Sequence, residues 1–443
     1  MTRRAPAAIA AFALWGCLIA TGAASAEFAS DRVRIGVLTD ESGPYADSAG
    51  PGAILAAKMA AEDFGGAVKG HKIEIVDADT QNKPDVAAAI ARRWYDAEGV
   101  NAIVDLPVTP VAFAVQEIAR QKNRTVMITA SAASEFTTKA CSPISSHWAD
   151  DTHALAAGTA KALSAEGGKN WFFITVDIAF GKALQEAATQ VIEAAGGKVI
   201  GSVRHPVGAS DFSSLILQAQ ASGADIIGLA SVGGDLVNIL KTANEFGVGH
   251  DGNQTLAGFL VYIDDVNALG LDVAKGLYVT TGFYWDQNDE ARAFARRFFE
   301  QRHAMPSKDQ AEVYVAVKHY LQAMDAAGTD DAVAVNKAMR AAPVDYFGKK
   351  ATIREDGRVL YDLTLYRVKG PADMKAPWDY YAPLRTIPAD EAFLPINKDV
   401  VQVLSWAQQF LGRRLAGYPA ISPARARAAA AARAISASRP SFP

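Results

Sequence analysis

The chain has 443 residues, half of them apolar, and a formal net charge of −4. This length is enough for two domains with sizeable cores, and the slightly acidic balance excludes the basic surface that nucleic-acid-binding proteins need. With two cysteines in the whole sequence, Cys17 and Cys141, neither a disulfide framework nor a cysteine-based metal site is expected.

The first 26 residues have the pattern of a secretory signal peptide. Two arginines precede an apolar run at 7–20, and small residues at 24–26 fit a cleavage site. The run is too short and wrongly flanked for a membrane span, although an uncleaved anchor is the alternative. The sequence around Cys17 only loosely resembles a lipidation site. We therefore expect residues 1–26 to be removed near Ala26 when the protein is exported.

Residues 35–52, IGVLTDESGPYADSAGPG, predict a short strand, a turn rich in Gly, Pro and Ser, and the start of a helix. A glycine-rich turn at this place can cradle a phosphate. Here the third glycine of a dinucleotide loop is missing and Pro51 offers no N–H group. No Walker motif occurs either. The turn therefore does not predict a nucleotide site.

Apolar runs of strand length alternate with helical patterns in two series, separated by the segment SSHWADD at 145–151. Uniformly apolar strands between amphipathic helices are typical of parallel sheets covered on both faces. The pattern predicts an α/β fold with two doubly wound parallel-sheet lobes. Two more helices follow Thr281, and a β-rich end spans 351–369. The last part, 396–443, is biased toward Ala, Arg and Pro and is expected to be a disordered tail.

Five segments follow one another in a specific order: SGPYA at 42–46, NAIVDLPVTPVA at 101–112, MITASAASEFT at 127–137, VDIAFGKAL at 176–184 and DFSSLILQAQASGADIIGLA at 211–230. With this order and spacing, the chain from Arg32 to Pro395 resembles the periplasmic substrate-binding proteins of ABC importers. The resemblance is to the type I branch, which serves branched-chain amino acids, amides and related compounds. It implies a periplasmic monomer without cofactor, metal or catalytic activity, whose partners are a small solute and the membrane permease subunits of an importer.

The resemblance also implies how the chain is divided between the lobes. The N-terminal lobe would hold residues 27–147 and 283–350, and the C-terminal lobe residues 148–282 and 351–395. Three crossover segments would then join the two lobes.

Two segments predict a site for a ligand carboxylate. In DLPVTPVAFAV, Thr109 is expected to cap a helix with Pro110 as its first residue, which leaves the next amides free for an anion. In TASAASEFTT, Ser131 and Ser134 offer hydroxyls and Ala132 allows close approach. Each hydroxyl could instead merely cap its helix. The two segments together, with the resemblance, favour the carboxylate site.

The resemblance also bears on the ligand's other end. Amino-acid binders of the family carry an acid for the ligand ammonium on a stretch that matches LAGFLVY at 256–262, and here that stretch has no acid. Asp264 and Asp265 follow it and could substitute only if the loop folds back. Because an unpaired buried charge is strongly unfavourable, the sequence favours a carboxylate without an α-ammonium. A branched-chain amino acid or an amide is the alternative ligand.

Seven aromatic residues are expected near the cleft loops, about half of them as packing residues: Tyr45, Trp148, Phe180, Phe259, Tyr262, Tyr284 and Trp285. This composition suits a planar, aromatic acid. The turn at 42–50 is expected to form a cleft wall that places Tyr45, Asp47 or Ser48 beside the ligand. The predicted binding residues are Tyr45, Asp47, Ser48, Thr109, Ala132, Ser134, Phe180, Phe259, Tyr262 and Trp285.

Other classes of function have weaker support. The sequence contains no G-x-S-x-G elbow and no H-E-x-x-H motif. His147 and His153 flank Asp150 and Asp151, but a six-residue spacing across a crossover is not a zinc pattern. A ligand-sensing module for a receptor stays possible, and an exported enzyme is the least favoured reading.

Overall fold

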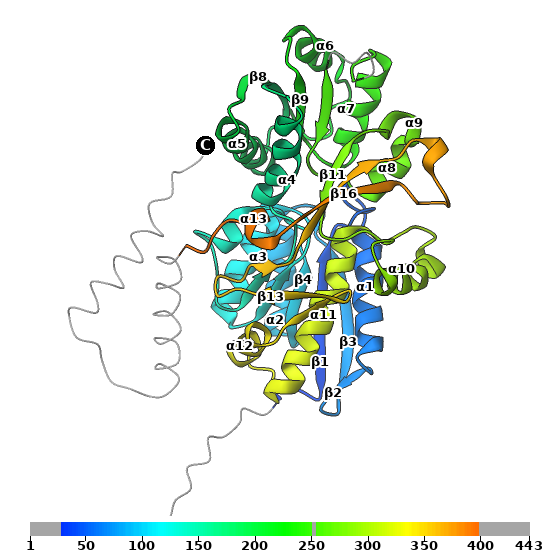
Figure 1. Cartoon of the computed structure of the whole chain (residues 1–443). Helices are drawn as coiled ribbons and strands as arrows, with labels where there is room; N and C mark the ends of the chain where they lie inside the picture. The colour runs from blue at the N-terminus through cyan, green and yellow to red at the C-terminus, as the bar shows by residue number, and fades with distance from the viewer. Residues whose placement is uncertain (1–27, 250–253, 398–443) are drawn as a thin grey trace, which may run out of the picture.

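The computed structural model describes residues 28–249 and 254–397, which form two lobes stacked end to end (Figure 1). The predicted signal peptide and tail lie outside the described residues. Within the described part of the chain, no helix combines the length and apolar character that crossing a membrane requires.

The N-terminal lobe is built on a six-stranded sheet in the order β2-β3-β1-β4-β5-β6, parallel except for β2. Its strands are β1 (Arg32–Thr39), β2 (Ala67–Val68), β3 (His71–Asp79), β4 (Val100–Asp105), β5 (Thr125–Ile128) and β6 (Ser145–His147). Helices cover both faces: α1 (Gly50–Asp63), α2 (Pro84–Asp96), α3 (Thr109–Lys122) and α11 (Lys308–Ala327).

The strand β4 shows why the predicted strand segments are apolar at every position. Ala102 and Val104 join the core beneath α1 and α11, whereas Ile103 joins the core beneath α2 and α3. Successive side chains of a strand point to opposite faces, so a strand covered on both faces must be apolar throughout. This confirms the predicted fold class for the lobe.

The C-terminal lobe has a four-stranded parallel sheet in the order β10-β9-β7-β8. Its strands are β7 (Asn170–Val176), β8 (Lys198–His205), β9 (Ile226–Ala230) and β10 (Thr255–Gly258). Its helices are α4 (Thr152–Ala165), α5 (Ala179–Ala194), α6 (Ser213–Ala221), α7 (Gly233–Glu245), α8 (Ile263–Leu269) and α9 (Leu271–Ala274). The lobe therefore repeats the doubly wound plan with fewer strands.

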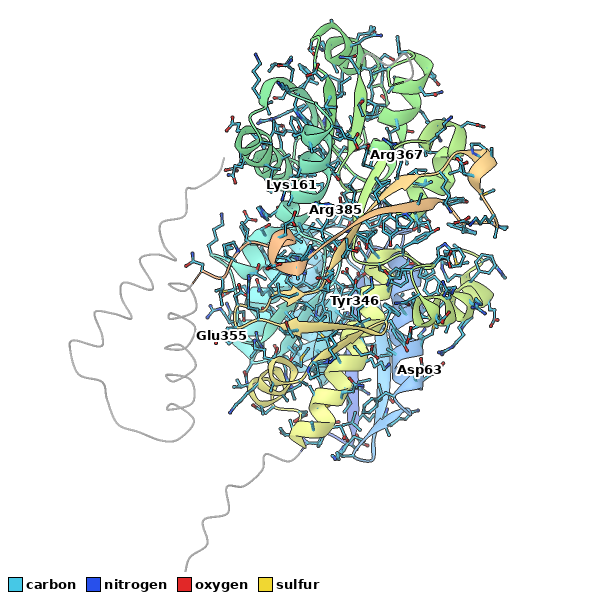
Figure 2. All side chains as sticks on the ribbon, in the orientation of Figure 1. Asp63, Lys161, Tyr346, Glu355, Arg367 and Arg385 are labelled. Carbon is cyan, nitrogen blue, oxygen red and sulfur yellow. The ribbon has the colours of Figure 1, made fainter. Side chains whose placement is uncertain are left out.

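The last third of the described chain adds helices and antiparallel sheets. The helices of this part are α10 (Asp289–Arg302), α12 (Ala332–Ala341), α13 (Ala389–Ala392) and the short 3₁₀ helix η2 (Pro371–Asp373). A second 3₁₀ helix, η1 (Ser134–Thr137), lies earlier, between β5 and β6. Two small sheets are antiparallel: β12 (Val344–Tyr346) with β13 (Lys349–Ile353) and β14 (Val359–Leu360), and β11 (Tyr278–Thr281) with β15 (Leu363–Val368) and β16 (Tyr381–Ile387). Lys161 and Arg385, labelled in Figure 2, both contact Glu391 of α13, at 2.6 and 3.3 Å, and this fastens the end of the described chain to α4 and β16.

One carboxylate joins the passages of the chain between the lobes. Asp150, between β6 and α4, accepts hydrogen bonds from the Gly282 amide after β11 (3.3 Å) and from the Tyr361 hydroxyl after β14 (3.0 Å). The Lys308 ammonium donates to the same carboxylate at 2.9 Å. We refer to Asp150, Gly282, Tyr361 and Lys308 as the hinge cluster. Its members tie the three passages to the start of α11.

The sequence predicts the third passage near Ala351, and the strand pairing favours a later position. β13, which holds Ala351, pairs with β12 and packs near α12 of the N-terminal lobe. We therefore propose Tyr361 and Asp362 as the third passage. The other limits of the lobes stay as the sequence predicts them and remain proposals.

Candidate functional site

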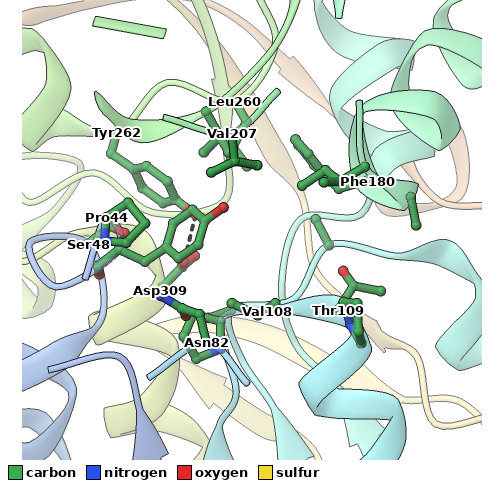
Figure 3. A pocket seen from close by; sticks show the side chains of 18 residues that line it. Pro44, Ser48, Asn82, Val108, Thr109, Phe180, Val207, Leu260, Tyr262 and Asp309 are labelled. Atoms are coloured by element: carbon green, nitrogen blue, oxygen red, sulfur yellow. Dashed lines mark hydrogen bonds between the residues drawn. The ribbon is translucent and has the colours of Figure 1, made fainter. Parts of the chain in front are cut away.

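A cleft of about 270 Å³ lies between the lobes (Figure 3). The N-terminal lobe contributes most of its polar side chains, namely Tyr45, Ser48, Asn82, Thr109 and Asp309. The C-terminal lobe contributes an almost entirely apolar wall: Ile178, Ala179, Phe180, Val207, Val232 and Leu260, with Tyr262 beside them. The cleft is therefore divided into a hydrogen-bonding side and an apolar side.

Six of the ten predicted binding residues line this cleft: Tyr45, Ser48, Thr109, Ala132, Phe180 and Tyr262. The other four, Asp47, Ser134, Phe259 and Trp285, do not.

The glycine-rich turn after β1 is held by a buried acid. The Asp40 carboxylate accepts hydrogen bonds from the amides of Gly43 (2.8 Å) and Tyr45 (2.9 Å). This fixes the turn so that Tyr45 and Ser48 face the cleft, as expected of a cleft wall. Burial, with smaller contributions from nearby acids, raises the pKa of Tyr45 to about 12, so its hydroxyl stays protonated at neutral pH. Asp47 is exposed and is not among the residues that line the cleft.

The start of α3 presents unused hydrogen-bonding groups to the cleft. The chain leaves β4 through Asp105 (φ 87°) and Leu106 (φ 67°), a left-handed conformation that is unusual for residues other than glycine. The helix cap is Val108, one residue earlier than predicted, because the Ala112 amide donates to the Val108 carbonyl (2.9 Å). Thr109 is consequently the first helical residue.

The Thr109 hydroxyl has no capping role. No side chain caps α3, and this hydroxyl has no hydrogen-bond partner in the described part of the chain, although the residue is only 8% exposed. The free amides at a helix N-terminus attract anions. A hydroxyl, free amides and the positive end of a helix dipole therefore meet at one point of the cleft.

In the second segment predicted to bind the carboxylate, the hydroxyls of Ser131 and Ser134 mainly stabilise the fold. Ser131 donates to the Leu106 carbonyl, and the Ser134 hydroxyl bonds to the Thr152 hydroxyl at 3.0 Å. These bonds hold the segment after β5 against the start of α4. Ala132 alone of the predicted residues in this segment lines the cleft, where its small side chain leaves room for a ligand.

Two predicted aromatic residues are packing residues. Phe259 is 1% exposed and stacks on Phe173, with ring centroids 6.0 Å apart, in the core of the C-terminal lobe. Trp285 donates its indole N–H to the Trp378 carbonyl at 2.8 Å. The neighbouring residues Leu260 and Tyr262 reach the cleft instead of Phe259. Sequence alone could not decide which residues after β10 face the cleft, because the strand ends there and the period of two is lost.

Asp309 is a buried acid of the cleft lining that is absent from the predicted binding residues, as are Asn82 and Leu260. It is the second residue of α11, is 2% exposed and lines the cleft. Its Oδ2 accepts a hydrogen bond from the Tyr262 hydroxyl at 2.7 Å. In the sequence it follows Ser307, which forms a capping box with Gln310, and an acid in the first turn of a helix is ordinary.

The two acids considered as substitutes for the missing ammonium partner do not line the cleft. Asp265 completes a capping interaction by accepting the Tyr262 amide at 2.9 Å. Asp264 is largely buried beside it, and burial raises its pKa well above the usual value. Neither carboxylate is placed to pair a ligand ammonium in this cleft.

The pair His147 and His153, considered above as a possible metal site, does not form one. His147 has a structural role. The His147 ring lies 2.7 Å from the Ser131 carbonyl and 3.1 Å from the Arg358 guanidinium, so both of its nitrogens are engaged. In the residues that the structure describes, no three His, Cys, Asp or Glu side chains are grouped to hold a metal ion.

Comparison with known proteins gives a consistent picture. Residues 32–374 match the sequence model of the family described as "Periplasmic binding protein". A periplasmic binding protein from Burkholderia mallei is 45% identical, with a TM-score of 0.79 over 82% of this chain and 96% of that one. A branched chain amino acid ABC transporter periplasmic ligand-binding protein from Burkholderia xenovorans is 38% identical, with a TM-score of 0.75 over 82% and 97% of the two chains.

A more distant structure shares the fold alone. It is a solute binding protein of an ABC transporter from R. palustris, solved in complex with benzoate. It is 20% identical, with a TM-score of 0.72 over 82% of this chain and 99% of that one.

Proposed function

The chain belongs to the periplasmic binding proteins, which capture solutes for ABC transporters, and from this premise we propose that its solute is a small carboxylate with a planar, aromatic body. The observation that carries the proposal is the division of the cleft. The start of α3 offers a hydroxyl and free amides for a carboxylate, and the opposite wall is apolar. Apolar walls with a few placed polar groups are typical of sites that enclose small molecules.

The apolar wall favours a flat body. Phe180, Leu260 and Val232 offer contact area without hydrogen-bonding groups. Tyr45 and Tyr262 add aromatic surface with polar tips. That a protein of this fold can enclose an aromatic acid is shown by the benzoate complex from R. palustris, which supports the proposal at the level of the fold only.

A branched-chain amino acid is the second candidate ligand. The Burkholderia xenovorans protein is described as belonging to a branched chain amino acid transporter. Asp309 also supplies a carboxyl group at the cleft, which could pair an ammonium if it were ionised. A receptor-sensing role would use the same cleft, and a transport assay with a strain lacking the protein would distinguish it from import.

A thermal-shift screen of benzoate-like acids, aliphatic acids, amides and amino acids tests the ligand class. A benzoate-like acid at roughly 100 times its Kd is expected to stabilise the protein by about 2.7 kcal/mol. Leucine and valine are expected to bind at least tenfold more weakly, because their ammonium group would lack a charge-assisted hydrogen bond. Such a bond contributes about 1.5–3 kcal/mol, and about 1.4 kcal/mol corresponds to a tenfold change in Kd. Thr109→Val should weaken acid binding at least tenfold. Thr189→Val, which removes a hydroxyl that bonds within α5 (2.8 Å to the Gln185 carbonyl), should leave it unchanged.

Strong stabilisation by leucine or valine, with none by the aromatic acids, would make the second candidate the ligand. Equal effects of Thr109→Val and Thr189→Val on the affinity would show that α3 does not hold the carboxylate.

Ligand binding is also expected to close the lobes. The cleft opens between two bodies joined by three passages, an arrangement suited to hinge motion. Solution X-ray scattering should show a smaller radius of gyration with a saturating aromatic acid than without it. Benzyl alcohol at the same concentration, which lacks the carboxylate, is the control. A radius that is the same with and without the bound acid would contradict closure.

A further inference from the structure

The Asp309 carboxyl group has one oxygen that nothing in the described protein uses. Its Oδ2 accepts the Tyr262 hydroxyl at 2.7 Å, whereas Oδ1 is buried and has no hydrogen-bond partner among the described residues. Leaving a buried polar atom without a partner is unfavourable. Because the residue lines the cleft, a ligand group is the candidate for the missing partner.

This oxygen lies away from the carboxylate position. Figure 3 shows Asp309 and Tyr262 on one side of the cleft, joined by their hydrogen bond, and Thr109 with Phe180 on the other. A ligand that places its carboxylate at Thr109 therefore extends its far end toward Asp309. A body that is apolar throughout would leave Oδ1 unpaired after the cleft closes.

The surroundings decide which polar group fits. The Lys308 ammonium lies 5.7 Å from the centre of the Tyr262 ring and 2.9 Å from Asp150, so a cation is already present beside Asp309. Burial raises the pKa of Asp309 to about 8, although Lys308 opposes the rise, and the group is therefore mostly neutral at pH 7. A ligand ammonium would need Asp309 ionised as its counter-charge, because Asp150 is already paired with the Lys308 ammonium. A hydroxyl both donates and accepts, so it fits either protonation state.

We propose that the solute carries a hydroxyl group at the end remote from its carboxylate, and that Asp309 and Tyr262 determine specificity by binding this hydroxyl. This inference rests on the proposed function, because it takes the carboxylate to lie at Thr109. Sites built to bind a hydroxyl discriminate strongly against analogues that lack it, because their own polar groups are then left unpaired.

The test compares benzoate with 4-hydroxybenzoate, 3-hydroxybenzoate and 4-(aminomethyl)benzoate by titration calorimetry at pH 7. One of the hydroxylated acids is expected to bind at least tenfold more tightly than benzoate. In Asp309→Leu the preference for the hydroxylated acid over benzoate should fall to about threefold or less, because the carboxyl group that pairs the hydroxyl is gone. In Asp309→Asn, which keeps an acceptor for Tyr262 and a donor for the ligand, most of the preference should remain.

Each outcome is informative. Equal affinity of the wild-type protein for benzoate and both hydroxylated acids overturns this inference and leaves the proposed function standing. Tighter binding of the aminomethyl acid overturns it in favour of a cationic end. If none of the acids binds, the proposed function itself fails. If Asp309→Leu does not fold, loss of the preference in Tyr262→Phe supports the inference, and an unchanged preference there overturns it.

Discussion

Replacing Lys308 by methionine is expected to lower the free energy of unfolding by about 3–5 kcal/mol, as for other buried ion pairs that lose one partner. The side chain of Lys308 is 5% exposed and that of Asp150 is not exposed at all, and the two are 2.9 Å apart. Burial alone would lower the pKa of Lys308, but the Asp150 carboxylate is the largest of the contributions that raise it above its usual value. Without the lysine, Asp150 keeps only its bonds from Gly282 and Tyr361.

Urea unfolding at pH 7 measures this effect. Lys182→Met is the matched control, because Lys182 and Asp177 form a pair at a similar distance (2.9 Å) with both side chains half exposed. Exposed pairs contribute about 0–1 kcal/mol. The double variant Lys308→Met with Asp150→Leu should recover much of the loss, since an apolar pair can replace a buried ion pair. A loss no larger than that of the control would show that the hinge cluster tolerates an unpaired Asp150.

A second large effect is expected from pH at Asp105. This carboxyl group is not exposed, and burial, reinforced by the neighbouring Asp40, raises its pKa to about 7. The folded protein therefore keeps a proton that the unfolded chain loses above its ordinary pKa of about 3.9. The resulting stabilisation is complete below that value and is lost as the pH rises toward 7.

Asp105→Asn should remove this dependence, and asparagine also tolerates the left-handed backbone at this position. The difference in the free energy of unfolding between the variant and the wild-type protein should shift in favour of the variant by up to about 4 kcal/mol from pH 4 to pH 7.5. One pKa unit corresponds to about 1.4 kcal/mol. Buried histidines such as His147, whose pKa is lowered by burial, act in the opposite direction, but they cancel in the difference between the two proteins. Unfolding by urea at both pH values gives the comparison.

The exposed variant Asp177→Asn is the control for this experiment. Lys182 holds the pKa of Asp177 below its usual range, so its contribution changes only in more acidic solution. A wild-type and Asp105→Asn difference that stays constant with pH would mean that Asp105 is ionised in the folded protein.

The fold could be predicted because each strand and helix has a characteristic local pattern of apolar residues. A strand such as β4 must be apolar on both faces, and a run of such strands between helices has few other solutions. The place of Thr109 in the cleft lining was predicted for a similar reason, since Thr109 and Pro110 are adjacent and mark the start of a helix. The cap itself lies at Val108, a shift of the kind that local patterns do not resolve.

The remaining site residues depend on contacts between distant parts of the chain. Asp309 meets Tyr262 across 47 positions of sequence, and Lys308 meets Asp150 across 158. No periodicity relates such pairs, and an acid in the first turn of a helix has an ordinary explanation that conceals its place in the cleft. Phe259 was misplaced for a related reason, because only the packing of the lobe decides that it faces Phe173.

The division of the cleft into a polar and an apolar side has a consequence for the timing of transport. We propose that the solute docks first at the hydrogen-bonding groups around Thr109, which lie on the N-terminal lobe, before the apolar wall covers it. The rate of capture is then governed by the N-terminal lobe. Release requires the wall that contains Phe180 and Leu260 to move away from the solute. Among related complexes, differences in affinity come mostly from differences in the dissociation rate. Smaller side chains at Phe180 and Leu260 should therefore raise the dissociation rate of the solute and leave its association rate nearly unchanged. The C-terminal lobe would then set how long the solute stays bound.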